Sequence, residues 1–143
     1  MPAPILIDTG AIVALLCQSD RHHIWARERF AEIEPPLLTC EAVLSEADHL
    51  VRRHARATGI VVGLLRRGVL RLGFELAREI EAIAAIQARY QDRPASLADA
   101  CLIRMSEIHD GSRVLTVDSD FRVYRRRGRE VIPTWMPDGP ATG

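Results

Sequence analysis

The chain has 143 residues, a size typical of one domain, and its 19 basic and 19 acidic side chains give a formal net charge of zero. A neutral protein has no strong overall field to attract anions, so any nucleic-acid-binding surface must be a local patch. All the basic residues are arginine, which excludes chemistry that requires a lysine. The three cysteines fit neither a disulfide framework nor a zinc-binding pattern, and no apolar run is long enough to span a membrane. We therefore expect a cytoplasmic protein without a membrane segment.

Short apolar runs alternate with helical patterns along the whole chain. Thr39 and Ser96 are predicted to cap the helices that follow them. The pattern predicts strands at residues 4–7, 37–38, 69–76, 113–118 and 130–135, helices at 11–18, 21–34, 40–55, 60–68, 77–91 and 97–109, and a short helix or turn at 119–128. This alternation indicates an α/β fold with a central, mostly parallel sheet flanked by helices. Residues 1–135 are expected to form one domain and residues 136–143 a flexible tail.

Acidic residues stand where two of the predicted strands end. Asp8 follows the first strand, and Asp118 ends the strand "VLTVD". Ligands of such sheets bind beyond the carboxyl ends of the strands, so both residues are candidates for a site. A strand-end aspartate is also a common turn residue or helix cap, and that alternative stays open for each of them taken alone.

Two further acids lie on predicted helices. Glu46 shares an apolar stripe with Val43, Ala47 and Leu50, so we expect it to face inward and to need a cation, a proton or an arginine partner. Asp99 follows Ser96 by three residues, as in a capping box, and falls outside the main apolar stripe of its helix, which is Leu97, Cys101, Met105 and Ile108.

Taken together, the four acids predict a metal site. Two carboxylates about 4 Å apart repel each other by about 4 kcal/mol at an effective dielectric constant of about 20. Four converging carboxylates therefore require a cation, and oxygen ligands suit Mg²⁺ or Mn²⁺ better than zinc. Such an ion can activate a water molecule and neutralise charge at a phosphate.

Three other readings of these acids fit poorly. An aspartic protease needs two Asp-Thr-Gly loops in a β-rich fold, and this chain has one, at residues 8–10, among many predicted helices. A phospho-acceptor receiver domain needs a lysine, which is absent. A phosphatase of the haloacid dehalogenase type has a second aspartate two residues after the first, where this chain has Gly10.

Four motifs resemble those of the PIN domain, and most closely the VapC-type ribonuclease toxins of bacterial toxin–antitoxin pairs. They are "LIDTGAIVALL", "TCEAVLSEADHL", "SLADACLIRMSE" and "VLTVDSDF", and they occur in the order and spacing of that family across about residues 4–133. The resemblance implies a three-layer sandwich and a metal-dependent endoribonuclease whose acidic quartet falls on Asp8, Glu46, Asp99 and Asp118. It also implies an RNA substrate, a homodimer and a cognate antitoxin.

Supporting residues follow from the same resemblance. Thr116 matches a position whose hydroxyl supports the acidic site, and Asp120 precedes Phe121 as the family pattern expects. Asp120 and Asp92 are equally well explained as a turn cap and a helix terminator. Many relatives carry a hydroxyl where this chain has Gly10, and Thr9 is the nearest replacement.

The alternative to an enzyme is a catalytically idle PIN-like module that acts through complex formation. Its acids would then bind arginines of a partner. Three arginine groups could instead contact RNA, and the sequence does not distinguish between them: Arg52, Arg53 and Arg56; Arg66, Arg67 and Arg71; and Arg125, Arg126, Arg127 and Arg129.

Overall fold

A computed structural model describes residues 3–137, and its centre is a sheet of five short strands. Every pairing in this sheet is parallel. In spatial order, the strands are β3 (Leu70–Leu72), β2 (Leu37–Thr39), β1 (Ile5–Ile7), β4 (Arg113–Leu115) and β7 (Thr134–Trp135). A separate antiparallel pair consists of β5 (Arg125–Arg126) and β6 (Glu130–Val131).

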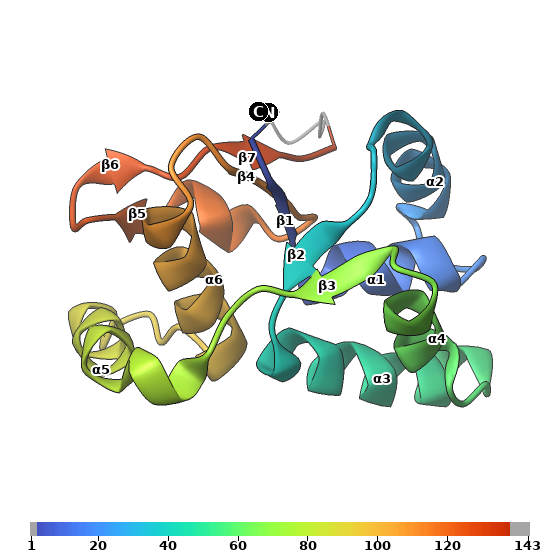
Figure 1. The fold of residues 1–143 in the computed structure, drawn as a ribbon, viewed down its shortest axis with the longest axis horizontal. Coiled ribbons are helices and arrows are strands. Elements are labelled where there is room, and N and C mark those ends of the chain that lie inside the picture. The colour runs from blue at the N-terminus through green and yellow to red at the C-terminus, as the bar shows by residue number, and fades with distance from the viewer. Residues whose placement is uncertain (1–2, 138–143) are drawn as a thin grey trace.

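Six α-helices surround the sheet within the described residues. They are α1 (Thr9–Leu16), α2 (His23–Glu32), α3 (Glu41–Ala55), α4 (Ile60–Arg66), α5 (Ile80–Arg89) and α6 (Leu97–Ile108), with 3₁₀ turns at Leu76–Arg78 and Ser119–Arg122. In the view of Figure 1, α1 to α4 lie to one side of the central strands and α5 and α6 to the other. The predicted class, a mostly parallel sheet flanked by helices, is confirmed. None of these helices has the length and apolar character needed to cross a bilayer.

Helix starts follow the local sequence. The Asp8 carboxylate caps α1 by accepting a hydrogen bond from the backbone N–H of Thr9, and the Ser96 hydroxyl caps α6 by accepting one from Asp99, as predicted. The prediction for Thr39 is wrong. Its hydroxyl donates to the carbonyl oxygen of Ile7 (3.3 Å) within the sheet, and α3 begins after Cys40 without a side-chain cap.

Helix α6 passes through the middle of the core. Its residues Ala98, Ala100, Cys101, Leu102, Ile103 and Met105 are all buried. The predicted stripe on this helix is partly wrong, because Leu97 and Ile108 are 44% and 45% exposed. A helix covered on several sides has no single apolar face that a periodic pattern could reveal.

Three predicted strands are shorter than expected. The segment 69–76 is a strand only at β3, and 113–118 only at β4. The segment 130–135 splits into β6, which pairs with β5, and β7, which pairs with β4. Only the part of a run that finds a partner becomes a strand. The expected boundary at residue 135 remains a prediction, and residues 138–143 of the expected tail lie outside the described part.

The strand order creates a switch point between β1 and β4. From β1 the chain adds β2 and then β3 on one side, and it later returns to place β4 on the other side. Connections that leave two neighbouring strands in opposite directions open a crevice beyond the carboxyl ends of those strands. Asp8 follows β1 directly, and Thr116, Val117 and Asp118 follow β4. Asp8, Thr116 and Asp118, which were selected from the sequence, therefore lie beyond the carboxyl ends of these two strands.

Candidate metal centre

Three of the four predicted acids meet in this crevice. Asp8, Asp99 and Asp118 each place one carboxylate oxygen so that the three oxygens lie within 4.8 Å of one another. Asp8 comes from the end of β1, Asp99 from the first turn of α6, and Asp118 from the turn after β4. Asp8, which lies 91 and 110 positions before the other two residues, thus forms a single anionic cluster with Asp99 and Asp118.

Asp8 is the most buried member of the cluster and the most firmly held. It is 4% exposed, and its Oδ1 accepts a hydrogen bond from the Thr9 N–H (2.7 Å) while its Oδ2 accepts one from the Thr116 hydroxyl (2.8 Å). Burial raises the pKa of Asp8 to about 7, and the charges of Asp99 and Asp118 act in the same direction, while the two hydrogen bonds oppose the shift. The carboxylate is therefore fixed in place but costly to ionise without a cation.

Thr116 connects Asp8 to Asp118. Its hydroxyl oxygen accepts a hydrogen bond from the Asp118 N–H (2.9 Å) while the hydroxyl donates to Asp8. Asp118 in turn caps the 3₁₀ turn that follows, because its Oδ1 accepts from the Asp120 N–H (2.8 Å). This chain of bonds sets the orientation of Asp118 relative to Asp8.

Asp99 is partly buried and is contacted by a residue that sequence reasoning missed. The Tyr124 hydroxyl donates to Asp99 Oδ2 at 2.9 Å. Burial raises the pKa of Asp99, as do the charges of Asp118 and Glu46, while the Tyr124 hydrogen bond lowers it. Tyr124 follows Phe121 by three residues, and this spacing of two large aromatic side chains was the available signal that both turn inward.

Glu46 does not face the core, and the expectation that it would is wrong. The buried face of α3 is formed by Val43, Ala47 and Val51, at steps of four residues, which leaves Glu46 exposed at its edge. Its Oε2 accepts a hydrogen bond from the hydroxyl of Thr9 (3.2 Å), so it lies at the rim of the crevice beside Asp8. It is the one predicted acid outside the three-oxygen cluster.

The arginine partners considered for these acids are absent from residues 3–137. No arginine there forms an ion pair with Asp8, Glu46, Asp99 or Asp118. Asp120, by contrast, is paired with Arg93 (2.6 Å) and lies outside the cluster, as does the exposed Asp92. The charge of the cluster is therefore not balanced by the described part of the chain.

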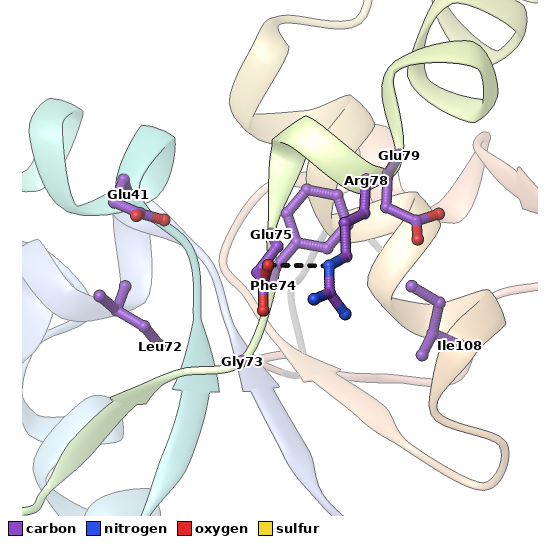
Figure 2. A pocket seen from close by; sticks show the side chains of 8 residues that line it. All are labelled: Glu41, Leu72, Gly73, Phe74, Glu75, Arg78, Glu79 and Ile108. Atoms are coloured by element: carbon purple, nitrogen blue, oxygen red, sulfur yellow. Dashed lines mark ion pairs between the residues drawn. The ribbon is translucent and has the colours of Figure 1, made fainter.

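A second hollow, of about 540 Å³, opens beyond the end of β3 (Figure 2). It also contains acids, but two of them are already neutralised. Glu75 pairs with Arg78 (3.1 Å), and Glu79 pairs with Arg104 (2.6 Å). Glu41 is the third, and none of the four predicted site acids lines this hollow. Among residues 3–137, the group of acids close enough together to hold a metal ion is the cluster of Asp8, Asp99 and Asp118.

Gly10 is required by close packing next to the cluster. A Cβ atom at this position would lie 2.6 Å from Cγ2 of Val117, the residue between Thr116 and Asp118. The hydroxyl-bearing side chain that the family resemblance leads us to expect here would thus have to displace Val117, and the hydroxyl of the neighbouring Thr9 bonds to Glu46.

We expect Gly10→Ser to lower the free energy of unfolding by about 1 kcal/mol, because overpacking costs about 1–3 kcal/mol and the better helix propensity returns less than about 1 kcal/mol. Adding Val117→Ala should recover most of the loss, since it removes the clashing methyl group. Urea unfolding of both variants, with Val117→Ala alone as the control, measures this. A Gly10→Ser protein as stable as the parent would show that the contact is not tight.

Comparison with known proteins places this fold and site in a family. The PIN domain family model matches residues 5–127, and the chain therefore belongs to the PIN domain family. Within that family it is similar to VapC-type proteins. It is 29% identical over 116 residues to ribonuclease VapC26 of Mycobacterium tuberculosis strain H37Rv, covering 80% of this chain and 86% of that protein. The resemblance drawn from the four motifs is thus confirmed.

A solved structure supports the same fold. The crystal structure of Mycobacterium tuberculosis VapC20, described as a sarcin-ricin loop cleaving toxin, superimposes with a TM-score of 0.71. The match covers 87% of this chain and 98% of that one at 24% sequence identity. At this level of identity, the likeness establishes the three-layer PIN architecture alone.

Proposed function

We propose that this protein is a divalent-metal-dependent endoribonuclease and the toxin of a toxin–antitoxin pair. The observation that carries the proposal is the cluster of Asp8, Asp99 and Asp118, whose oxygens lie within 4.8 Å without an arginine partner in the described chain. Membership of the PIN family and the similarity to a protein named a ribonuclease support the activity.

The donor set fits a hard dication. All three clustered ligands are carboxylates, and oxygen ligands of this kind suit Mg²⁺ or Mn²⁺. Their mutual repulsion, about 4 kcal/mol for a pair about 4 Å apart at a dielectric constant of about 20, is relieved either by protonation or by a cation. A dication relieves it more effectively than a single proton does, because it attracts all three carboxylates.

The residues of the site would have different roles in binding the ion and in hydrolysis. Asp8, Asp99 and Asp118 would hold the ion, and Thr116 would keep Asp8 and Asp118 aligned by its two hydrogen bonds. A bound ion supplies an activated water and neutralises charge at the scissile phosphate. Glu46, which is exposed at the rim and accepts a hydrogen bond from Thr9, would orient water or accept a proton at its free oxygen. Asp120 would act at a distance, by donating its N–H to Asp118.

Partners follow from the relatives by analogy. VapC20 is described as cleaving the sarcin-ricin loop and VapC26 as a ribonuclease, so we infer RNA as the substrate class here. We also infer a cognate antitoxin, a homodimer and action in the cytoplasm. The domain would comprise residues 1–135.

The direct test is RNA cleavage by the full chain freed of bound partner. Incubated with total RNA and Mg²⁺ or Mn²⁺, the protein is expected to release discrete fragments with 5′-phosphate and 3′-hydroxyl ends, and a chelator is expected to stop the reaction. Folded protein that cleaves no RNA with either metal, yet binds an arginine-bearing partner, would instead support the idle binding module.

A further inference from the structure

Tyr124 is buried beside the cluster and has one side-chain partner there. Its side chain is 0% exposed, and its hydroxyl donates to Asp99 Oδ2 at 2.9 Å. A phenol that donates to one oxygen of a carboxylate leaves the other oxygen free for a cation. The bond therefore selects one orientation of Asp99 out of those available to a side chain on the first turn of a helix.

The Tyr124 ring is held rigidly in its place. It packs edge-on against Phe121 (ring centroids 5.3 Å apart, planes at 89°) and against Tyr90 (5.1 Å, 69°). Edge-to-face aromatic pairs of this kind stabilise beyond the burial of the rings. The Tyr90 hydroxyl in turn accepts a hydrogen bond from the N–H of Arg125, the residue after Tyr124 (2.7 Å). Neither the ring nor its backbone is free to withdraw from Asp99.

Tyr124 also belongs to the segment that carries Asp118. Its N–H donates to the carbonyl oxygen of Asp120 (3.0 Å), and the N–H of Phe121 donates to that of Asp118 (3.2 Å). The segment 118–124 thus holds Asp118 at its start and, through the Tyr124 hydroxyl at its end, Asp99. This arrangement ties α6 to the end of β4 across the cluster, although α6 and the turn are separate elements.

We propose that Tyr124 is the positioning residue of Asp99, and that its hydroxyl sets the affinity of the acidic cluster for a divalent cation. The inference rests on the proposed function, since it takes the cluster to be a metal site. Loss of a residue that orients a metal ligand typically costs 10- to 100-fold in metal affinity.

The first experiment measures Mn²⁺ binding to the full chain by calorimetry or by the paramagnetic resonance signal of free Mn²⁺. Tyr124→Phe keeps the buried ring and removes only the hydroxyl, and it is expected to weaken binding by about 10-fold or more. Tyr90→Phe is the matched control, because it removes the neighbouring hydroxyl, which contacts backbone and no carboxylate. Because it keeps the ring that packs against Tyr124 and loses only the bond to the Arg125 N–H, it should weaken binding much less than Tyr124→Phe does. Thermal melting without metal separates lost stability from lost affinity, and a structural role alone would change only the melting temperature.

A second measurement does not depend on the Tyr124→Phe protein being folded. The chain has two tyrosines, so Tyr124 is the only one left in the Tyr90→Phe protein. Adding Mg²⁺ to this protein should perturb the tyrosine band of its near-ultraviolet absorbance, because the cation draws charge from the carboxylate that accepts the phenol proton. Asp99→Asn should abolish the change. A tyrosine band that does not respond to saturating Mg²⁺ overturns the inference.

Asp8→Asn separates the two proposals, because it removes a cluster carboxylate and leaves the Tyr124–Asp99 bond intact. If Asp8→Asn loses Mn²⁺ binding while Tyr124→Phe binds as the parent does, the positioning role is wrong and the metal centre stands. If the parent and Asp8→Asn bind Mn²⁺ equally weakly, the metal centre fails and the role of Tyr124 fails with it.

Discussion

Asp118→Asn and Asp8→Asn are each expected to lower metal-dependent RNA cleavage by more than about 100-fold. Residues that only orient a ligand already cost 10- to 100-fold, so loss of a ligand itself should cost more. Asparagine keeps the size of the side chain and one acceptor oxygen, so the Asp120 N–H and the Thr9 N–H can still be satisfied. At position 8 the amide NH2 group then faces the Thr116 hydroxyl, whose oxygen can accept from it in place of the present bond. The substitution therefore removes charge from the cluster with little change in packing.

The geometry also predicts that RNA cleavage falls by different amounts in different variants. Glu46→Gln should lower cleavage less than Asp118→Asn does, because Glu46 lies exposed at the rim and outside the three-oxygen cluster. Asp48→Asn on the same helix is the matched control, since Asp48 pairs with Arg52 in solvent (3.4 Å) and should not affect the rate. Initial rates with a fixed RNA at saturating Mn²⁺ measure all four variants. Undiminished cleavage by both Asp8→Asn and Asp118→Asn would identify the activity as a contaminant.

The metal-free protein is expected to lose stability as pH rises from about 4 to about 7. The folded pKa of Asp8 is about 7, above its ordinary value of 3.8, because burial disfavours the charged form. The folded state therefore binds this proton more tightly than the unfolded state does, and the stabilisation is complete below the unfolded pKa and lost as pH passes through the folded one. A difference of about 3 pKa units corresponds to about 4 kcal/mol over the whole range. The raised pKa of Asp99 acts in the same direction.

Urea unfolding in the presence of a chelator, at several pH values across this range, measures the effect. Asp8→Asn should flatten the profile and should be more stable than the parent above pH 7, because it has no buried charge to ionise at that position. A parent and an Asp8→Asn variant with the same pH dependence would show that Asp8 does not titrate as described.

Saturating Mn²⁺ should raise the melting temperature of the parent near neutral pH, since it binds the ionised carboxylates of the folded state only. The absence of a Mn²⁺ shift would argue against a preformed site.

Several features of the fold could be predicted from local sequence. The run Ile5–Ile7 is apolar and ends at an aspartate, and Ser96 precedes a helix by one residue, so the positions of β1 and α6 follow from chain neighbours alone. Strand lengths could not be predicted from local sequence in the same way. Residues 130–135 were predicted to form one strand, yet its two ends pair with different strands, and pairing with a distant partner cannot be predicted from the local sequence.

The sequence by itself determined the fold class, the strand-end positions of Asp8 and Asp118, and the helical position of Asp99, because these depend on periodicity and on residues a few positions apart. Only the tertiary structure decided which carboxylates meet. It excluded Glu46 from the cluster, brought Thr116 against Asp8 across 108 positions, and set the Tyr124 hydroxyl on Asp99. The physical reason is that a side chain's direction near a helix edge or after a turn is fixed by the packing of other elements against it, and this packing has no signature in the local pattern.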